Sequence, residues 1–208
     1  METRRLLLTI VCLAALPALL LLVGCNVIAF AAGAVPQKVS ARYEPPKTPM
    51  LVLVENRQNP GTMVTEADQL TLFIMDDLAT YKVAPLIELK KLYELRDNEK
   101  NIDKMTISQI GKAVGAQQVL YVDLQRLNVS EDEGGVPVHS RLEATVHMVD
   151  VKTGTTTFPA MGQANWPINM ETPITSMGNR ANSDAVRESL LGSVGTSIGR
   201  LFHDYMVQ

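Results

Sequence analysis

The sequence predicts an α/β sandwich, in which a mixed sheet of about five strands packs against helices in the order β-α-β-α-β-β-β-α. Three observations predict this fold. Residues 50–55 are a short, continuous apolar run, as in a strand buried on both faces. Residues 141–151 alternate apolar and polar side chains, as in a strand with one buried face. Residues 183–205 repeat apolar side chains at helical spacing.

The first half of the domain contains the first strand and helix. A turn at residues 56–61 follows the strand, and Thr65 is the expected N-cap of a helix, with Asp68 at the reciprocal position. The apolar positions of this helix are Leu70, Phe73, Ile74, Leu78 and Tyr81. Residues 83–89 fit a second strand, at an edge because of Pro85, whereas residues 86–95 fit the start of a helix instead.

A second helix precedes the central strand. Residues 94–104 are a charged connection, and Thr106 caps the helix, with Gln109 completing a capping box. Gly115 ends it. Residues 118–127 are then a strongly apolar strand.

The last third predicts strands and a final helix. Residues 131–135 are an acidic, glycine-rich loop tip, and the strand at 141–151 returns through a turn as a hairpin over 156–163. Residues 165–182 are expected to form a loop. Ser183 caps a helix whose Gly192, Gly195 and Gly199 permit close approach to another backbone.

The leader is typical of an exported lipoprotein. Arg4 and Arg5 precede an apolar run from Leu6 to Leu22, which ends in Leu22-Val23-Gly24-Cys25. These four residues resemble the bacterial lipobox, which implies cleavage between Gly24 and Cys25 and attachment of acyl chains, palmitate among them, to the Cys25 thiol. Residues 1–24 are then the signal peptide. Because Asn26 is not the aspartate that retains some lipoproteins in the inner membrane, the outer membrane is favoured.

Two alternatives fit the same leader. Residues 6–35 are long enough for an uncleaved membrane helix, although that interpretation is weakened by Pro17, Gly24, Asn26 and Gly33. Ala29-Phe30-Ala31 also fits an ordinary signal-peptidase site, which would release the protein from the membrane.

The predicted domains are a lipid anchor and proline-rich tether at residues 25–49 and an α/β domain at residues 50–208. Pro36, Pro45, Pro46 and Pro49 lie among polar residues, as in an extended tether of about 3.1 Å per residue.

Residues 110–120 and 148–154 resemble a known domain. A helix with Ile110-Gly111 leads through Gly115-Ala116 into a strand, and a later strand ends Met148-Val149-Asp150-Val151-Lys152-Thr153-Gly154. This pattern, within residues 50–163, is similar to the small α/β domain of the TolB amino-terminal domain, LpoB and CsgG. The resemblance implies an envelope lipoprotein or periplasmic protein that binds other proteins. A CsgG-like pore is not expected, because residues 128–140 are too short and acidic for membrane-spanning hairpins.

Composition and motifs argue against several classes of function. The 208-residue chain has a net charge of −3 and only 5 % aromatic residues, which disfavours nucleic-acid binding. Its only cysteines, Cys12 and Cys25, lie in the leader, so the domain has no disulfide and no thiolate metal site. His139, His147 and His203 are scattered in the sequence, with no metal-ligand spacing. Asp76 and Asp77 are expected on a solvated helix face.

Two functions follow from these features. The first is a non-catalytic binding or scaffold subunit, without cofactor or metal, of an envelope complex for cell-wall synthesis, transport or secretion. It is held on a membrane facing the periplasm by lipidated Cys25, with a protein partner that the sequence does not identify. The alternative is an envelope hydrolase with an unrecognised carboxylate and histidine site, for which His147 and Asp150 are candidates.

Overall fold

The computed structural model describes residues 36–59, 61–131, 137–160, 163, 165–173 and 183–207. They divide into two units, of which residues 40–204 form the larger. The other unit contains a two-stranded antiparallel ribbon of β1 (Gln37–Val39) and β7 (Tyr205–Val207), with Gln37 opposite Val207. Cys25 and the rest of the leader lie outside the described residues.

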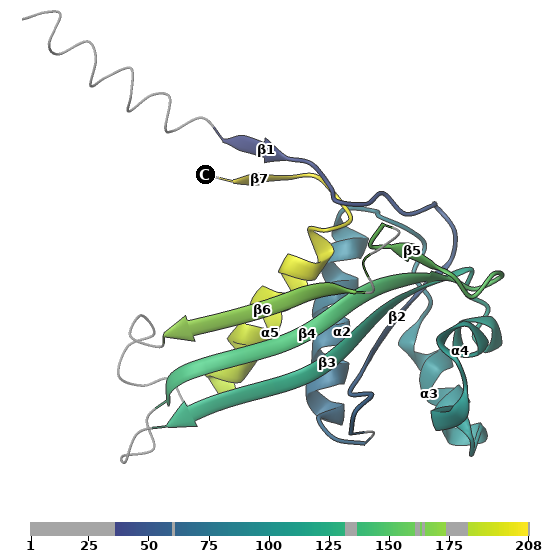
Figure 1. Cartoon of the computed structure of the whole chain (residues 1–208), viewed down its shortest axis with the longest axis horizontal. Helices are drawn as coiled ribbons and strands as arrows, with labels where there is room; N and C mark the ends of the chain where they lie inside the picture. The colour runs from purple at the N-terminus through teal and green to yellow at the C-terminus, as the bar shows by residue number, and fades with distance from the viewer. Residues whose placement is uncertain are drawn as a thin grey trace, which may run out of the picture. The chain divides into compact units, whose positions relative to one another are not determined.

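The larger unit is built on a five-stranded mixed sheet, which confirms the predicted fold class (Figure 1). Strand β2 (Met50–Glu55) runs parallel to β3 (Gln118–Glu131), which pairs antiparallel with β4 (Pro137–Asp150). The short β5 (Thr156–Phe158) and the longer β6 (Trp166–Pro173) both pair antiparallel with β4.

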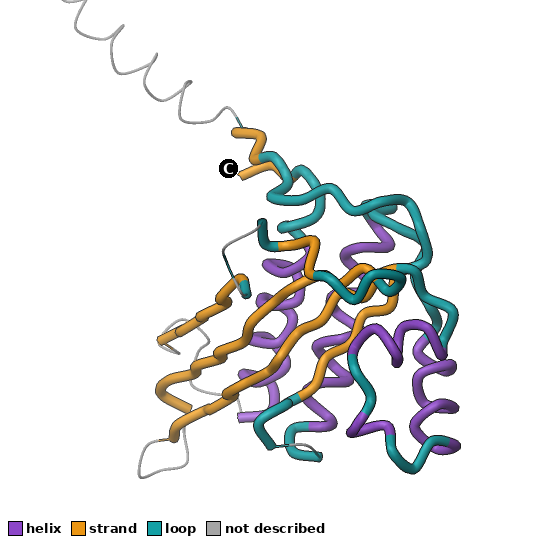
Figure 2. Tube along the Cα trace, turned by 45° about the vertical axis from the view of Figure 1, so that its right-hand side comes forward, coloured by secondary structure: helices purple, strands orange, loops and turns teal. Residues whose placement is uncertain are grey.

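Helices lie on both faces of this sheet, which explains the continuous apolar run of β2. Figures 1 and 2 show α2 (Val64–Thr80) and α5 (Ser183–Gly199) behind the sheet. The helices α3 (Leu89–Asn98) and α4 (Ile107–Ala113) and the short 3₁₀ helix η1 (Ile102–Lys104) lie beside β2. Successive strand residues point to opposite faces. Val52, Leu120 and Val122 therefore join the core under α2 and α5, and Leu51, Leu53 and Val119 pack with α3 and α4.

Glycines of α5 allow the close helix contact that the sequence predicted. A Cβ atom on Gly195 would lie 2.5 Å from Cβ of Phe73 on α2 and 3.2 Å from its backbone carbonyl carbon. A Cβ atom on Gly199 would collide with the carboxylate of Asp77. Backbone of α5 therefore lies directly against α2.

Two local predictions around α4 are confirmed. The Thr106 hydroxyl accepts a hydrogen bond from the Gln109 backbone N–H at 3.2 Å, and the Gln109 side chain accepts one from the Thr106 N–H at 2.8 Å. Gly115 has a φ of +81°, a left-handed conformation that favours glycine.

The start of α2 differs from the prediction, and Thr65 is not its N-cap. The helix begins at Val64, and Met63 holds the cap position at a φ of 53° without a side-chain hydrogen bond. The left-handed backbone at Gly61 and Met63 brings the chain into the helix before Thr65 is reached.

The connection from α2 to α4 is more helical than expected. Between residues 83 and 89 only Leu86 pairs with β2, through a single parallel bridge to Met50, so no second strand forms there. A helix forms there instead, as in the alternative prediction for residues 86–95, but α3 begins at Leu89, three residues later than that range. The segment predicted as a charged connection, residues 94–104, contains the last residues of α3 and the whole of η1.

The region predicted as a loop at 165–182 contains β6. Trp166 lies opposite Val146 and Pro173 opposite His139. The strand is hard to recognise in the sequence because it contains Pro167 and Pro173. An edge strand tolerates proline because one of its sides has no hydrogen-bonded neighbour. The final helix ends at Gly199, so Tyr205 lies in β7 rather than on the helix face.

Residues 40–49 belong to the larger unit and are bonded to its carboxyl-terminal part. The backbone N–H groups of Arg42 and Tyr43 donate to the Leu201 carbonyl, at 2.8 and 3.0 Å. The ring of Tyr43 lies 5.7 Å from Phe158, and Pro45 is buried. This part of the proline-rich segment is therefore held against the domain by backbone hydrogen bonds and apolar contacts.

Candidate functional site

A cavity of about 450 Å³ lies at the carboxyl end of β2. The first turns of α2 form one side, and α3, η1 and the start of α4 form the other. Ligands of open α/β sheets bind outside the carboxyl ends of the strands, and cavities of this volume accommodate small molecules or side chains of a partner. Its position and size therefore make it the candidate site.

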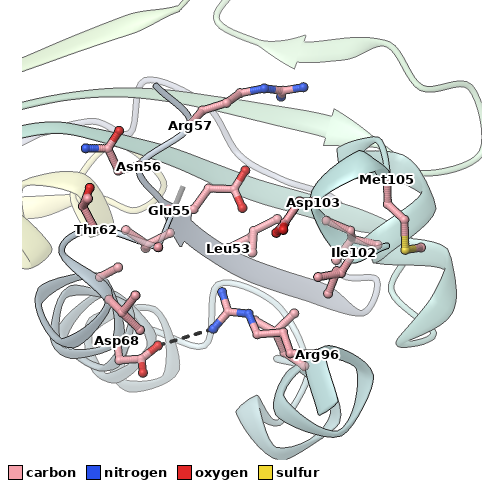
Figure 3. A pocket seen from close by; sticks show the side chains of 16 residues that line it. Leu53, Glu55, Asn56, Arg57, Thr62, Asp68, Arg96, Ile102, Asp103 and Met105 are labelled. Carbon is pink, nitrogen blue, oxygen red and sulfur yellow. Dashed lines mark ion pairs between the residues drawn. The ribbon is translucent and has the colours of Figure 1, made fainter. Parts of the chain in front are cut away.

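The cavity combines an apolar floor with a charged rim (Figure 3). The apolar side chains of the floor come from five elements, β2, α2, α3, η1 and α4: Leu53, Ala67, Leu92, Ile102 and Ile110. The charged rim residues come from β2, the loop after it, α2, α3 and η1: Glu55, Arg57, Asp68, Arg96 and Asp103. Polar groups placed above an apolar floor orient a ligand in a binding site.

One ion pair crosses the cavity from α2 to α3. The carboxylate of Asp68 lies 3.7 Å from the Arg96 guanidinium, and the two side chains are 37 % and 30 % exposed. Burial, and then the neighbouring Asp68 charge, raise the pKa of Tyr93 on α3. A partly exposed pair at this distance contributes about 0–1 kcal/mol, so it forms a wall that a ligand can displace at small cost.

Glu55 is positioned by a buried phenol. The hydroxyl of Tyr121, a residue only 1 % exposed, donates to Glu55 Oε1 at 2.9 Å. Burial, and then the charge of Glu55, raise the pKa of Tyr121 far above its usual value. Tyr121 therefore remains a neutral donor that fixes the Glu55 carboxylate at the cavity mouth.

His147 lies on the sheet face next to Tyr121, with ring centroids 4.8 Å apart. Its Nδ1 is buried and has no hydrogen-bond partner among the described atoms. Burial, and then the positive charge of Arg57, lower the pKa of His147, so the ring is neutral near pH 7. It does not line the cavity.

The two hydrolase candidates do not converge. His147 and Asp150 are three positions apart on β4, so their side chains leave opposite faces of the strand. Asp150 instead accepts hydrogen bonds from the backbone N–H and hydroxyl of Thr153 in the following turn, and these bonds lower its pKa.

His203 contacts a carboxylate of α2. It follows α5, and its Nε2 lies 2.7 Å from Oδ2 of Asp77, while Nδ1 lies 2.9 Å from the Asp204 carbonyl oxygen. Asp77 is therefore not on a solvated face, because Gly199 lets α5 approach α2 and brings His203 onto it. His139 lies apart, on β4.

The lipid-attachment and cleavage residues, Gly24 and Cys25, lie outside the described residues. Within the described ranges, no group of three histidine, cysteine or acidic side chains is arranged to hold a metal ion. No helix there is both long and apolar enough to span a bilayer.

Sequence reasoning did not identify the cavity. One signal was present, since the polar residues Glu55, Asn56 and Arg57 directly follow a buried strand. Arg96 and Asp103 lay in a segment interpreted only as a charged connection. Nothing in their spacing indicates that α3 and η1 pack against the end of β2.

No protein-family model matches this chain, and no curated protein matches it. Solved structures do, at low identity. The lipoprotein GNA1162 from Neisseria meningitidis is 14 % identical with a TM-score of 0.47, over 73 % of this chain and 97 % of that one.

Two further solved structures are similar to this chain. A PelC dodecamer from Paraburkholderia phytofirmans is 14 % identical with a TM-score of 0.39, over 79 % of this chain and 96 % of that one. The LpoB C-terminal domain from Salmonella enterica is 20 % identical with a TM-score of 0.36, over 65 % of this chain and 85 % of that one. LpoB, named by the sequence resemblance, is thus among the structural neighbours, and the likeness is one of fold.

Proposed function

We propose that this chain is an envelope lipoprotein, anchored through Cys25, that binds a partner protein through the cavity at the end of β2. It acts as a non-catalytic subunit of a larger complex for cell-wall synthesis, transport or secretion. The cavity is the observation that carries the binding role, because it offers an apolar floor and directional charges.

The groups in the cavity favour binding over hydrolysis. Glu55 accepts a hydrogen bond from Tyr121, and Asp68 is paired with Arg96. No histidine is among the lining residues. Nucleophile, base and orienting group, which a triad-type hydrolase requires, do not come together there among the described residues.

The leader supports the membrane anchor. Cys25 follows an apolar run and an aliphatic residue at the lipobox position. Two or three acyl chains, each stabilising the bound state by about 0.8 kcal/mol per buried CH₂, hold a protein stably on a bilayer. We place the domain on the periplasmic side, with the outer membrane favoured by Asn26.

The anchor is tested by Cys25→Ser in the full chain, with mass spectrometry of the mature amino terminus. We expect unprocessed precursor without acyl chains. Cys12→Ser is the matched control and should mature normally. Normal cleavage and membrane retention of Cys25→Ser would contradict the lipoprotein proposal.

The binding role is tested by photo-crosslinking in cells that express the chain from its own gene. A photoreactive residue replaces Thr62, which lines the cavity, or Ser189, which is exposed on α5. We expect a discrete adduct with one envelope protein from position 62 alone. The same adducts from both positions, or none, would contradict partner binding at this cavity.

A further inference from the structure

The charges around the cavity do not balance. Arg96 is already paired with Asp68, and Figure 3 shows the Arg57 side chain directed away from the cavity. Glu55 of β2 and Asp103 of η1 remain, and both line the cavity (Figure 3). Among the described residues, the neutral Tyr121 is the only hydrogen-bond donor to the Glu55 carboxylate, and the Asp103 side chain has no partner. The mouth therefore favours a cation.

The floor below these carboxylates is apolar. Leu92, with 3 % of its surface exposed, and Ile110, with 5 %, lie under the mouth together with Ile102. A lysine or arginine side chain complements this arrangement, because its apolar stem matches the floor and its positively charged head matches the carboxylates at the mouth. Such a side chain would lay its stem on the floor and donate charge-assisted hydrogen bonds to Glu55 and Asp103.

The surface next to the cavity indicates a protein rather than a free amine. On α2, Val64 and Leu72 lie four residues on either side of Asp68, and therefore on one face of the helix. Val64 is 50 % exposed and Leu72 is 56 % exposed. A small amine would leave both uncovered, whereas a peptide with aliphatic residues beside its cation would bury them.

We infer that the cavity binds a lysine or arginine side chain of a partner protein, presented on an extended segment with aliphatic neighbours. This inference rests on the proposed function and specifies the chemistry of its partner. The cation lies between Glu55 and Asp103, and the aliphatic neighbours lie on Val64 and Leu72.

Methyl NMR of the full chain in detergent micelles tests the inference with defined peptides. The probe is a blocked pentapeptide, Ala-Leu-Lys-Leu-Ala. Matched peptides carry arginine, norleucine or glutamate at the centre, and n-butylamine represents a free amine. The methyl groups of Ile102 and Met105 report from the cavity, and that of Ile198, which is 0 % exposed in the other core, is the internal control.

We expect saturable shifts at Ile102 and Met105 with the lysine and arginine peptides and none at Ile198. The norleucine peptide should bind about tenfold more weakly or worse, because it lacks the charged hydrogen bonds. The glutamate peptide and n-butylamine should produce no saturable shift. Binding should weaken as salt rises, because the pair is near the surface.

Charge-neutral variants identify the groups responsible. Glu55→Gln and Asp103→Asn should each reduce affinity for the lysine peptide by about tenfold. Glu88→Gln is the matched control, since Glu88 is exposed and does not line the cavity. Retained Ile198 signals establish that each variant is folded.

Equal binding of the lysine and norleucine peptides, unchanged affinity in both variants, or saturation by n-butylamine would overturn the inference. So would the absence of shifts with every peptide. If crosslinks from position 62 persist while the peptides fail, only the cationic partner chemistry is wrong. Loss of the crosslinks as well would remove the proposed binding function.

Discussion

At its amino-terminal end α2 presents Asp68 to Arg96 of α3, and near its carboxyl-terminal end it presents Asp77 to His203. The first pair is 3.7 Å apart with both side chains about one-third exposed, and the second is 2.7 Å apart with exposures of 11 % for Asp77 and 7 % for His203. Water solvates the first pair if it breaks, but not the second. Helix α2 thus carries a solvent-accessible ion pair at the cavity and a buried polar pair at its opposite end.

The surroundings of the Asp77–His203 pair are also more tightly packed than those of the Asp68–Arg96 pair. The ring of Tyr81 stacks on His203 with centroids 3.7 Å apart, and Gly199 allows α5 to press against Asp77. Around Asp68 there is instead a cavity of about 450 Å³. Packing is tight where α5 lies against α2, and it leaves a cavity where α2 faces α3.

The largest effect is expected from breaking the buried pair. His203→Ala leaves the Asp77 carboxylate buried without its partner, which typically costs about 3–5 kcal/mol. Urea unfolding of the full chain in micelles, followed by circular dichroism, measures this loss. His139→Ala is the control and should change the free energy of unfolding by less than about 0.5 kcal/mol. Equal stability of both variants would mean that the buried pair contributes nothing.

The next effect comes from the contact between α2 and α5. Gly195→Ala places a methyl group 2.5 Å from Cβ of Phe73, and overpacking of this kind costs about 1–3 kcal/mol. At Gly192 the nearest atom would be 3.6 Å away, so Gly192→Ala should be neutral or stabilise by up to about 1 kcal/mol through helix propensity. Thermal unfolding compares them, and a stabilised Gly195→Ala would refute the tight contact.

A smaller effect is expected from pH at His147. Its native pKa lies below the unfolded value of 6.5, so only the unfolded chain gains a proton as the pH falls through that value. Stability should therefore decrease on acidification, with a slope of at most about 1.4 kcal/mol per pH unit from this group. His147→Gln should remove this part of the slope between pH 7 and 5. An identical slope in both proteins would argue that His147 is protonated when folded.

The smallest effect is expected at the cavity. Asp68→Ala should change the free energy of unfolding by no more than about 1 kcal/mol, because the pair with Arg96 is partly exposed. Urea unfolding measures this at low and high salt, and Arg96→Ala should match it. If Asp68→Ala lowered the free energy of unfolding as much as His203→Ala, the Asp68–Arg96 pair would be a structural contact like the Asp77–His203 pair.

The sequence predicted those parts of the fold that depend on interactions between residues close together in the chain. The capping residues Thr106 and Gln109 and the left-handed Gly115 fix the two ends of α4 through contacts within a few residues. β6 could not be found in this way. It carries Pro167 and Pro173 and exists because β4 offers it a free side to pair with.

The candidate site shows the same division. The sequence by itself predicted the leader, with Cys25 after its apolar run, and it determined the buried strand that ends at Glu55, because both are patterns of neighbouring residues. Only the tertiary structure brought Arg96 and Asp103 to the end of that strand, and His203 onto Asp77. Those contacts join residues separated by tens of positions, and the packing of helices on the sheet, rather than any local propensity, decides which of them meet.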